Sequence, residues 1–102
     1  MISWDKLRGF EWDQGNIDKS YQKHGITPKE SEEVFLDSNL QIIRDLKHSK
    51  KEPRFIIIGK SFKKKTLFVV FALRKNKVRV VSARLANKKE RRYYEQKIKK
   101  DS

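Results

Sequence analysis

The sequence contains no cysteine among its 102 residues, which excludes disulfides, thiolate zinc sites and cysteine nucleophiles. The longest uninterrupted apolar run, over 67–73, is far too short to cross a bilayer. Residues 1–5 lack the basic-then-apolar pattern of a signal peptide. A chain of this length can bury one hydrophobic core. We therefore expect a single cytoplasmic domain over 1–102, with flexible ends at 1–9 and 99–102.

Acidic residues are scarce relative to basic ones. The chain has 26 lysine and arginine residues against 13 aspartate and glutamate residues, a net charge of +13. Residues 1–39 contain 8 acidic and 5 basic residues, whereas residues 40–102 contain 5 acidic and 21 basic ones. This asymmetry predicts a polyanion-binding surface, with RNA as the expected partner. The alternative is a lysine-rich surface that serves solubility. No amphipathic helix has a bulky apolar face, so a membrane partner is not expected.

The hydrophobic pattern predicts an α+β fold. We expect a short strand over 10–12, two helices, a four-stranded antiparallel sheet and a C-terminal helix. The helices are expected at 14–24, from 28 to about 36, and from 88 to about 97, and the four strands at 40–45, 54–59, 66–74 and 78–86. The short turns between consecutive strands indicate an antiparallel meander.

Two capping boxes mark helix starts. Thr-Pro-Lys-Glu at 27–30 and Asn-Lys-Lys-Glu at 87–90 both place a glutamate three residues after a capping side chain. Between them, both faces of the strand over 67–73 are apolar, whereas a sheet with one solvated face should alternate. We therefore expect both faces to be covered, either by helices on opposite sides or in part by a partner protein.

The sequence resembles the BrnT family of type II toxins from about residue 10 to about residue 95. The similarity rests on the order and spacing of short segments, none of which is specific alone. The segments are Phe-Glu-Trp-Asp at 10–13, Lys-His-Gly-Ile at 23–26, Glu-Val-Phe-Leu-Asp at 33–37, Asp45, His-Ser at 48–49, Glu-Pro-Arg-Phe at 52–55, Ile-Gly at 58–59, Ser-Ala-Arg at 82–84, Glu90 and Tyr94.

The resemblance implies a RelE-like fold and RNA cleavage that blocks translation. It also implies neutralisation by a BrnA-like antitoxin, with which a heterotetramer is expected. The chain departs from the family pattern in two places. Pro53 stands where a second acidic residue is usual, which alters a loop near the presumed site. The run of lysines at 63–65 replaces a turn that often contains glycine, which adds phosphate-binding charge.

Metal-free RNA cleavage needs a base for the 2′-OH proton, cations for the charge on the phosphate, and an acid for the leaving 5′-oxygen. Arginine suits the second task because its planar fork is always charged and binds phosphate oxygens in pairs. We expect no metal and no cofactor. The candidate catalytic residues are Arg84, Arg74, Arg54, Glu52, His48 and His24.

Among the arginines, Arg84 is the first candidate for a phosphate ligand because it ends a strand beside the start of the last helix. Its alternative role is an ion pair with Glu90 or Glu95. Arg74 ends the neighbouring strand, where it either joins Arg84 or only flanks the hairpin turn. Arg54 begins a strand two residues after Glu52.

Glu52 and Arg54 form either a base–cation pair or an ordinary surface salt bridge of small worth. The two histidines titrate near neutrality and suit acid–base roles. His24 precedes a helix-ending glycine, so it is also a candidate for interaction with the last helical carbonyls. His48 lies in a polar loop that leads toward Glu52. A zinc site on the two histidines lacks the further ligands that such a site needs.

A second set of residues is expected to hold RNA. The set is Lys63, Lys64, Lys65, Lys88, Lys89, Arg92, Trp12 and Tyr94. The basic residues at the start of the last helix, Lys88, Lys89, Arg91 and Arg92, supply affinity that is independent of RNA sequence, or they bind ribosomal RNA or an acidic antitoxin segment. The aromatic residues are candidates for base stacking. The alternatives are that Trp12 lies in the core and that Tyr94 packs on the sheet with Ile98.

Three classes of function therefore compete. The first is a ribonuclease toxin. The second is a non-enzymatic nucleic-acid-binding module, which the charge supports equally well although no known RNA-binding motif is present. The third is an inactive toxin homologue that acts only as an assembly partner. Cleavage of RNA by the purified protein separates the first class from the other two.

Overall fold

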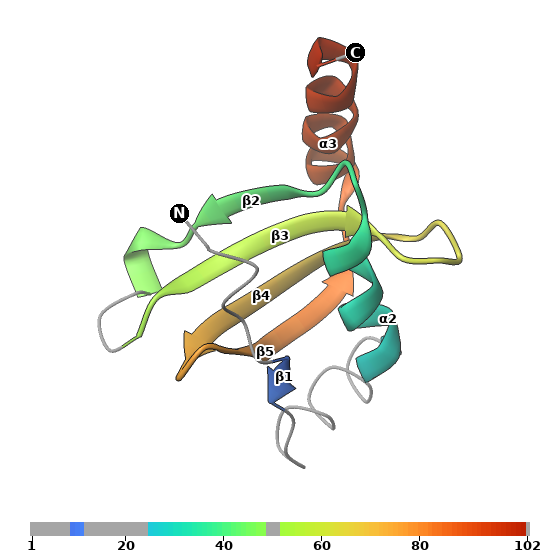
Figure 1. Cartoon of the computed structure of the whole chain (residues 1–102). Coiled ribbons are helices and arrows are strands. Elements are labelled where there is room, and N and C mark those ends of the chain that lie inside the picture. The colour runs from blue at the N-terminus through green and yellow to red at the C-terminus, as the bar shows by residue number, and fades with distance from the viewer. Residues whose placement is uncertain (1–8, 12–24, 49–51, 102) are drawn as a thin grey trace.

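A computed structural model describes residues 9–11, 25–48 and 52–101 of the chain (Figure 1). The elements in chain order are β1 (Phe10–Glu11), α2 (Pro28–Glu33), the 3-10 helix η2 (Val34–Leu36), β2 (Gln41–Arg44), the 3-10 helix η3 (Leu46–His48), β3 (Arg54–Lys60), β4 (Thr66–Arg74), β5 (Lys77–Leu85) and α3 (Lys88–Asp101). The α+β class predicted from the sequence is confirmed. The helix expected over 14–24 lies outside the described residues.

The strands form one mixed sheet in the order β1-β5-β4-β3-β2. Strands β2 to β5 are the antiparallel meander that the sequence predicts. β1, the short strand expected near 10–12, joins this sheet parallel to β5, whereas the sequence predicts a sheet of four antiparallel strands without it. Phe10 pairs with Val78, far along the chain. Because no local turn joins these partners, the residues near β1 and β5 do not indicate that the two strands pair.

The β4–β5 hairpin turns through two residues. Arg74 pairs with Lys77, and the intervening Lys75 and Asn76 have φ angles of 51° and 65°. Two consecutive positive φ angles define a type I′ turn, whose twist matches that of the flanking strands. The tight turn expected here is confirmed. It places Arg74 at one end of the sheet.

α2 begins at the capping box that the sequence predicts. The Glu30 N–H donates to Thr27 Oγ1 at 3.1 Å, and the Thr27 N–H donates to Glu30 Oε1 at 3.2 Å. After Glu33 the helix tightens into η2. The two helices lie against one face of the sheet, where Val34 belongs to the main core cluster with Ile57 and others.

Gly59 sets how closely this helical segment approaches β3. A Cβ atom at this position would lie 3.1 Å from the backbone oxygen of Val34 and 3.3 Å from the Val34 Cβ atom. These distances are shorter than ordinary van der Waals contacts. The absence of a side chain at Gly59 therefore allows η2 to pack directly on the strand.

The two faces of β4 are covered unequally. Leu67, Val69 and Phe71 are fully buried on the face that meets α2, whereas Phe68 and Val70 on the other face are half-buried. The expectation of two covered faces is thus met only in part. The covered face also contains a chain of aromatic contacts, in which the Phe35 ring packs edge-on against Phe10 and Phe71.

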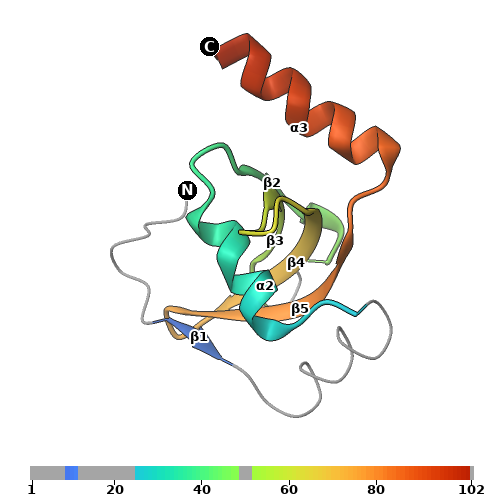
Figure 2. The same ribbon diagram turned by 90° about the vertical axis from the view of Figure 1, so that its right-hand side faces the viewer.

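α3 contacts β3 on the less covered face. Ile58, which faces away from Ile57, is 2% exposed there. Figure 2 shows that the helix extends away from the sheet, apart from α2. It runs to Asp101, past the limit near Lys97 that the sequence predicts. In the described part of the chain, no helix combines the length and apolar character needed to cross a membrane.

Candidate active site

A row of charged side chains crosses the less covered face of the sheet. Register pairs Glu11 with Arg79, Arg79 with Ala72, and Ala72 with Arg54. Directly paired residues project to the same face, so these side chains lie together over Ala72. Ala72 is fully buried. We define the arginine–glutamate cluster as Glu11, Glu52, Arg54, Arg74 and Arg79.

Hydrogen bonds between guanidinium and carboxylate groups hold the cluster together. Arg74 Nε and Nη2 donate to the two oxygens of Glu52 at 3.1 and 3.2 Å. Arg74 Nη1 donates to Glu11 Oε1 at 3.4 Å, and Arg79 Nη1 donates to the same oxygen at 3.1 Å. Arg74 therefore links two carboxylates that come from distant parts of the sequence.

The arginines set the protonation state of Glu52. The hydrogen bond from Arg74 lowers the pKa of this carboxyl, burial acts in the opposite direction, and the charges of Arg74, Arg54 and Arg79 lower the pKa further. Glu52 is consequently ionised at neutral pH, the state in which a carboxylate can accept a proton. The Arg74 side chain is 44% exposed and that of Glu52 is 24% exposed, so solvent and ligands can reach the pair.

The structure gives Glu52 a different partner from the one expected. The sequence predicts that Glu52 and Arg54 form either a base–cation pair or a surface salt bridge, but the bidentate hydrogen bonds to Glu52 come from Arg74. Arg54 begins β3, two residues after Glu52, and acts on it through charge. The reason is the hairpin geometry, which places the end of β4 beside the start of β3.

Arg84 lies in a separate ion pair. Its Nη1 and Nη2 atoms each donate to one oxygen of Glu90 at 2.8 Å, and its guanidinium carbon lies 4.0 Å from the centre of the Phe68 ring. Glu90 Oε1 also accepts the Asn87 N–H at 2.9 Å, as the capping box predicts. Burial alone would raise the pKa of Glu90, but the hydrogen bonds from Arg84 and Asn87 lower it overall. Arg84 therefore has the geometry of an ion pair with Glu90, the alternative role that the sequence left open for it.

The structure does not bring Arg74 and Arg84 together. Arg74 pairs with Lys77 at one end of the β4–β5 ladder, whereas Arg84 pairs with Phe68 near the other end. Six residues of strand separate positions 68 and 74, which corresponds to about 20 Å. Of the two alternatives for Arg74, a phosphate site shared with Arg84 is therefore not the arrangement in this structure.

The predicted RNA-binding lysines lie away from the arginine–glutamate cluster. Lys63, Lys64 and Lys65 form the β3–β4 loop at the opposite end of the strands. Lys65 Nζ lies 3.2 Å from Glu30 Oε2 in an ion pair. Lys88, Lys89 and Arg92 are exposed on the first turns of α3.

Tyr94 packs inside the protein and is not placed to stack on an RNA base. Its side chain is 1% exposed, and its hydroxyl donates to Asp37 Oδ2 at 2.5 Å. Burial raises the pKa of Tyr94, and the Asp37 carboxylate raises it further. In this structure its ring is closed to an RNA base. Of the other expected residues, Trp12 and His24 lie outside the described residues, and the backbone at His48 ends η3.

Two members of the cluster were not anticipated from the sequence. Arg79 stands inside a strand rather than at its end, and Glu11 belongs to the short first strand. A signal for Arg79 exists in the sequence, since it is a charged residue between the apolar Val78 and Val80 and must face away from their side of the sheet. Nothing in the sequence pattern indicates that Arg79 contacts Glu11. Among the described residues, no group of three or more histidine, cysteine, aspartate or glutamate residues has the arrangement of a metal site.

The fold and the cluster define a small basic α+β protein with cationic groups, and an ionised carboxylate among them, on an open sheet face. That arrangement suits binding and rearrangement of a phosphodiester. Residues 12–90 match the family described as the ribonuclease toxin BrnT of type II toxin–antitoxin systems, and the chain belongs to this family. The resemblance noted from short segments is thereby confirmed. A comparison with curated proteins found no match.

Proposed function

We propose that the chain is a metal-independent endoribonuclease that cuts RNA in the cytoplasm and so inhibits translation. The arginine–glutamate cluster is the observation that carries this proposal. It combines an ionised carboxylate, Glu52, with three guanidinium groups on an accessible face. The BrnT family is described as a family of ribonuclease toxins, which supports RNA as the substrate.

In the proposed reaction Glu52 is the base. It takes the proton of a ribose 2′-OH, and the oxygen attacks the adjacent phosphorus. The bond to the 5′-oxygen breaks, and that oxygen leaves with a proton from an acid, for which His48 is the candidate from sequence. The products are a 2′,3′-cyclic phosphate and a 5′-OH. Arg74 and Arg79 stabilise the charge on the phosphate oxygens.

Binding of the phosphate requires Arg74 to exchange part of its contact with Glu52. Its guanidinium donates to both oxygens of Glu52 and to Glu11 in the structure. A phosphate oxygen therefore binds by replacing some of these contacts. The exposed Lys88, Lys89 and Arg92 supply affinity for the flanking backbone.

A BrnA-like antitoxin is the proposed partner, in a heterotetramer with two copies of each chain. The family is described as belonging to type II toxin–antitoxin systems, in which the antitoxin is a protein. Phe68 and Val70 are half-buried on the less covered face of β4. A partly exposed apolar surface of this kind suits a protein interface.

The test uses purified protein and RNA in EDTA. Cleavage should persist, and the new ends should be 2′,3′-cyclic phosphate or 3′-phosphate with 5′-OH. Arg79→Ala should lower kcat/KM by about 10²-fold or more, the loss typical for one group that stabilises transition-state charge. Arg44→Ala is the matched control, because Arg44 is exposed and lies over the Phe55 ring, on the opposite face of the sheet. Loss of cleavage in EDTA, or 5′-phosphate ends, would contradict the proposed chemistry.

A non-enzymatic nucleic-acid-binding module, or an inactive toxin homologue, is the alternative. The observation that favours it is that both oxygens of Glu52 accept hydrogen bonds from Arg74. If these contacts persist when RNA is bound, they stabilise the ionised carboxylate and make it a weaker base. RNA binding without cleavage by the wild-type protein would support this alternative.

A further inference from the structure

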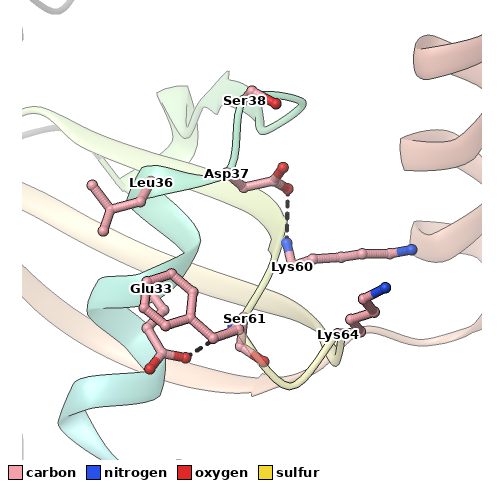
Figure 3. A pocket seen from close by; sticks show the side chains of 8 residues that line it. Glu33, Leu36, Asp37, Ser38, Lys60, Ser61 and Lys64 are labelled. Carbon is pink, nitrogen blue, oxygen red and sulfur yellow. Dashed lines mark hydrogen bonds between the residues drawn. The ribbon is translucent and has the colours of Figure 1, made fainter.

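A cleft of about 440 Å³ opens between η2 and the β3–β4 loop. Figure 3 shows that Leu36 and Asp37 line it from the helical side, while Lys60 and Lys64 line it from the strand and loop. Lys60 ends β3, whereas Arg54 begins the same strand. Six residues of strand correspond to about 20 Å, so the cleft is distinct from the arginine–glutamate cluster.

Two large apolar side chains in this cleft are exposed. Leu36 is 74% exposed and Phe62 is 66% exposed, and both belong to the cleft lining. Single exposed apolar residues are common on protein surfaces, but two that share one concave site are typical of a binding surface. The pair provides a place for an apolar side chain of a ligand.

The carboxylates of the cleft are already bound by the chain itself. Glu33 Oε1 accepts the Phe62 N–H at 2.9 Å. Asp37 Oδ2 accepts the Lys60 N–H at 2.8 Å and the Tyr94 hydroxyl at 2.5 Å. These contacts hold the carboxylates against the cleft walls, where Glu33 is 8% exposed and Asp37 is half-buried, so the exposed charges of the cleft are those of its lysines.

The lysine ammonium groups of the cleft differ from its carboxylates. In the part of the chain that the structure describes, Lys60 and Lys64 have no carboxylate partner, and the Lys60 ammonium lies over the Tyr94 ring at 5.9 Å. Lys65, in the same loop, is instead neutralised by Glu30. The ligand that complements this cleft therefore carries negative charge beside an apolar side chain.

We propose that this cleft anchors an acidic segment of the antitoxin protein, with an apolar side chain between Leu36 and Phe62 and carboxylates at Lys60 and Lys64. The partner's identity rests on the proposed function. A protein segment is favoured because Leu36 offers a nucleotide neither a stacking surface nor a hydrogen bond, whereas an apolar side chain can contact both Leu36 and the Phe62 ring. Since the cleft lies apart from the arginine–glutamate cluster, anchoring of the antitoxin and cleavage of RNA are separable by mutation.

The experiment measures the affinity of the full-length chain for the polypeptide encoded by the adjacent reading frame, by calorimetry on purified proteins. Leu36→Asp and Phe62→Asp should each weaken binding by about tenfold or more, as for an interface hot spot. Leu46→Asp is the matched control, because Leu46 is 77% exposed and lies outside the cleft. It should leave the affinity within about threefold. All three variants should retain wild-type RNA cleavage without the partner.

Charge is tested separately with Lys64→Glu, which should weaken binding, and Lys75→Glu, which should not. Both lysines are exposed turn residues with positive φ, so the pair is matched in backbone conformation. Hydrogen exchange on the wild-type complex gives a readout that needs no variant. The backbone amides of residues 36 and 61–64 should gain protection when the partner binds.

The proposal is overturned if the wild-type proteins do not bind, if Leu46→Asp weakens binding as much as Leu36→Asp, or if the cleft amides gain no protection. It is also overturned if Lys64→Glu lowers RNA affinity while partner affinity is unchanged, because the cleft would then belong to the RNA surface. A protein that binds the partner through Leu36 but cuts no RNA would defeat the proposed function alone.

Discussion

Arg79 and Glu11 are 68 positions apart in the sequence, yet Arg79 Nη1 lies 3.1 Å from Glu11 Oε1. The contact joins β5 to the two-residue β1 at the edge of the sheet. It gives Glu11 a positioning role, in which the carboxylate holds the Arg79 guanidinium over the sheet face. If Arg79 binds the phosphate, loss of Glu11 weakens catalysis only because the Arg79 guanidinium is no longer held in place.

The first prediction follows from that relationship. Glu11→Gln should lower kcat/KM for RNA cleavage by about tenfold, because the guanidinium loses a charged partner worth on the order of 1–2 kcal/mol. In an Arg79→Ala background, Glu11→Gln should have almost no further effect. Kinetics of the wild type, both single variants and the double variant measure this. Multiplicative losses in the double variant would show that Glu11 acts independently of Arg79.

The second prediction concerns the pH dependence of cleavage. Hydrogen bonding to Arg74 lowers the pKa of Glu52 below its ordinary value of about 4.5. If Glu52 is the base, it stays ionised as pH falls from 7 to about 4.5, and the acidic limb of kcat/KM lies below that value. If a histidine is the base, the acidic limb lies near its usual pKa of about 6.5. A pH–rate profile on a short RNA separates the two assignments, and Glu52→Gln should abolish the low-pH limb in the first case.

The third prediction decides the role of Arg84. The bidentate contact with Glu90 makes it a structural residue that ties the first turn of α3 to the sheet. Arg84→Ala should therefore lower the free energy of unfolding by about 1 kcal/mol, a value discounted because the side chain is 35% exposed. A double-mutant cycle with Glu90→Ala should give a coupling energy of similar size. Loss of RNA cleavage at unchanged stability would instead support Arg84 as a phosphate ligand.

The starts of α2 and α3 and the meander could be predicted from the sequence because their signals are local. The capping boxes at Thr27 and Asn87 mark two helix starts, and the type I′ turn at Lys75 and Asn76 follows from the short spacing between strands. The pairing of β1 with β5 could not be predicted. The pairing depends on the path of the chain between the two strands, and the two residues of β1 do not indicate which strand they pair with.

The candidate site could be predicted only in its residue types. Arginines at strand ends and a preceding glutamate were anticipated, and Glu52, Arg54 and Arg74 do lie together. Their pairing depends on strand register, which also moves Arg84 to the other end of the sheet and brings in Arg79. The sequence could not choose between ligand and ion-pair roles for Arg84, because both require an arginine beside a helix start.

The fourth prediction concerns the contact that fixes α3. The Tyr94 hydroxyl donates to the Asp37 carboxylate from a buried position, so Tyr94→Phe should lower the free energy of unfolding by about 1.5–3 kcal/mol. The pKa of Tyr94 is raised in the folded protein above its ordinary value of about 10. The stabilisation is therefore present below pH 10 and declines above it by about 1.4 kcal/mol per pH unit, as the unfolded tyrosine ionises. Denaturant titrations of wild type and Tyr94→Phe at pH 7 and pH 11 check this. An unchanged difference between the proteins at pH 11 would contradict it.

The fifth prediction tests the basic first turns of α3 as an RNA surface. Lys88 and Lys89 are exposed, and contacts with phosphates release counterions from RNA. Replacing both by glutamate should weaken binding to unrelated RNA sequences alike, and it should reduce the slope of log affinity against log salt by about 0.7 for each lost contact. The variant should fold normally, because glutamate is favourable near a helix N-terminus.

The control for this prediction changes the net charge equally at a different place. Lys29 on α2 and Lys47 on η3 are also exposed, so Lys29→Glu with Lys47→Glu matches the charge change without touching α3. A local RNA surface predicts a larger loss of affinity and of salt slope for the α3 variant than for this control. Equal losses in filter-binding titrations at several salt concentrations would mean that RNA responds only to the net charge of the protein. The positive charge of α3 would then have no specific part in holding the substrate near the arginine–glutamate cluster.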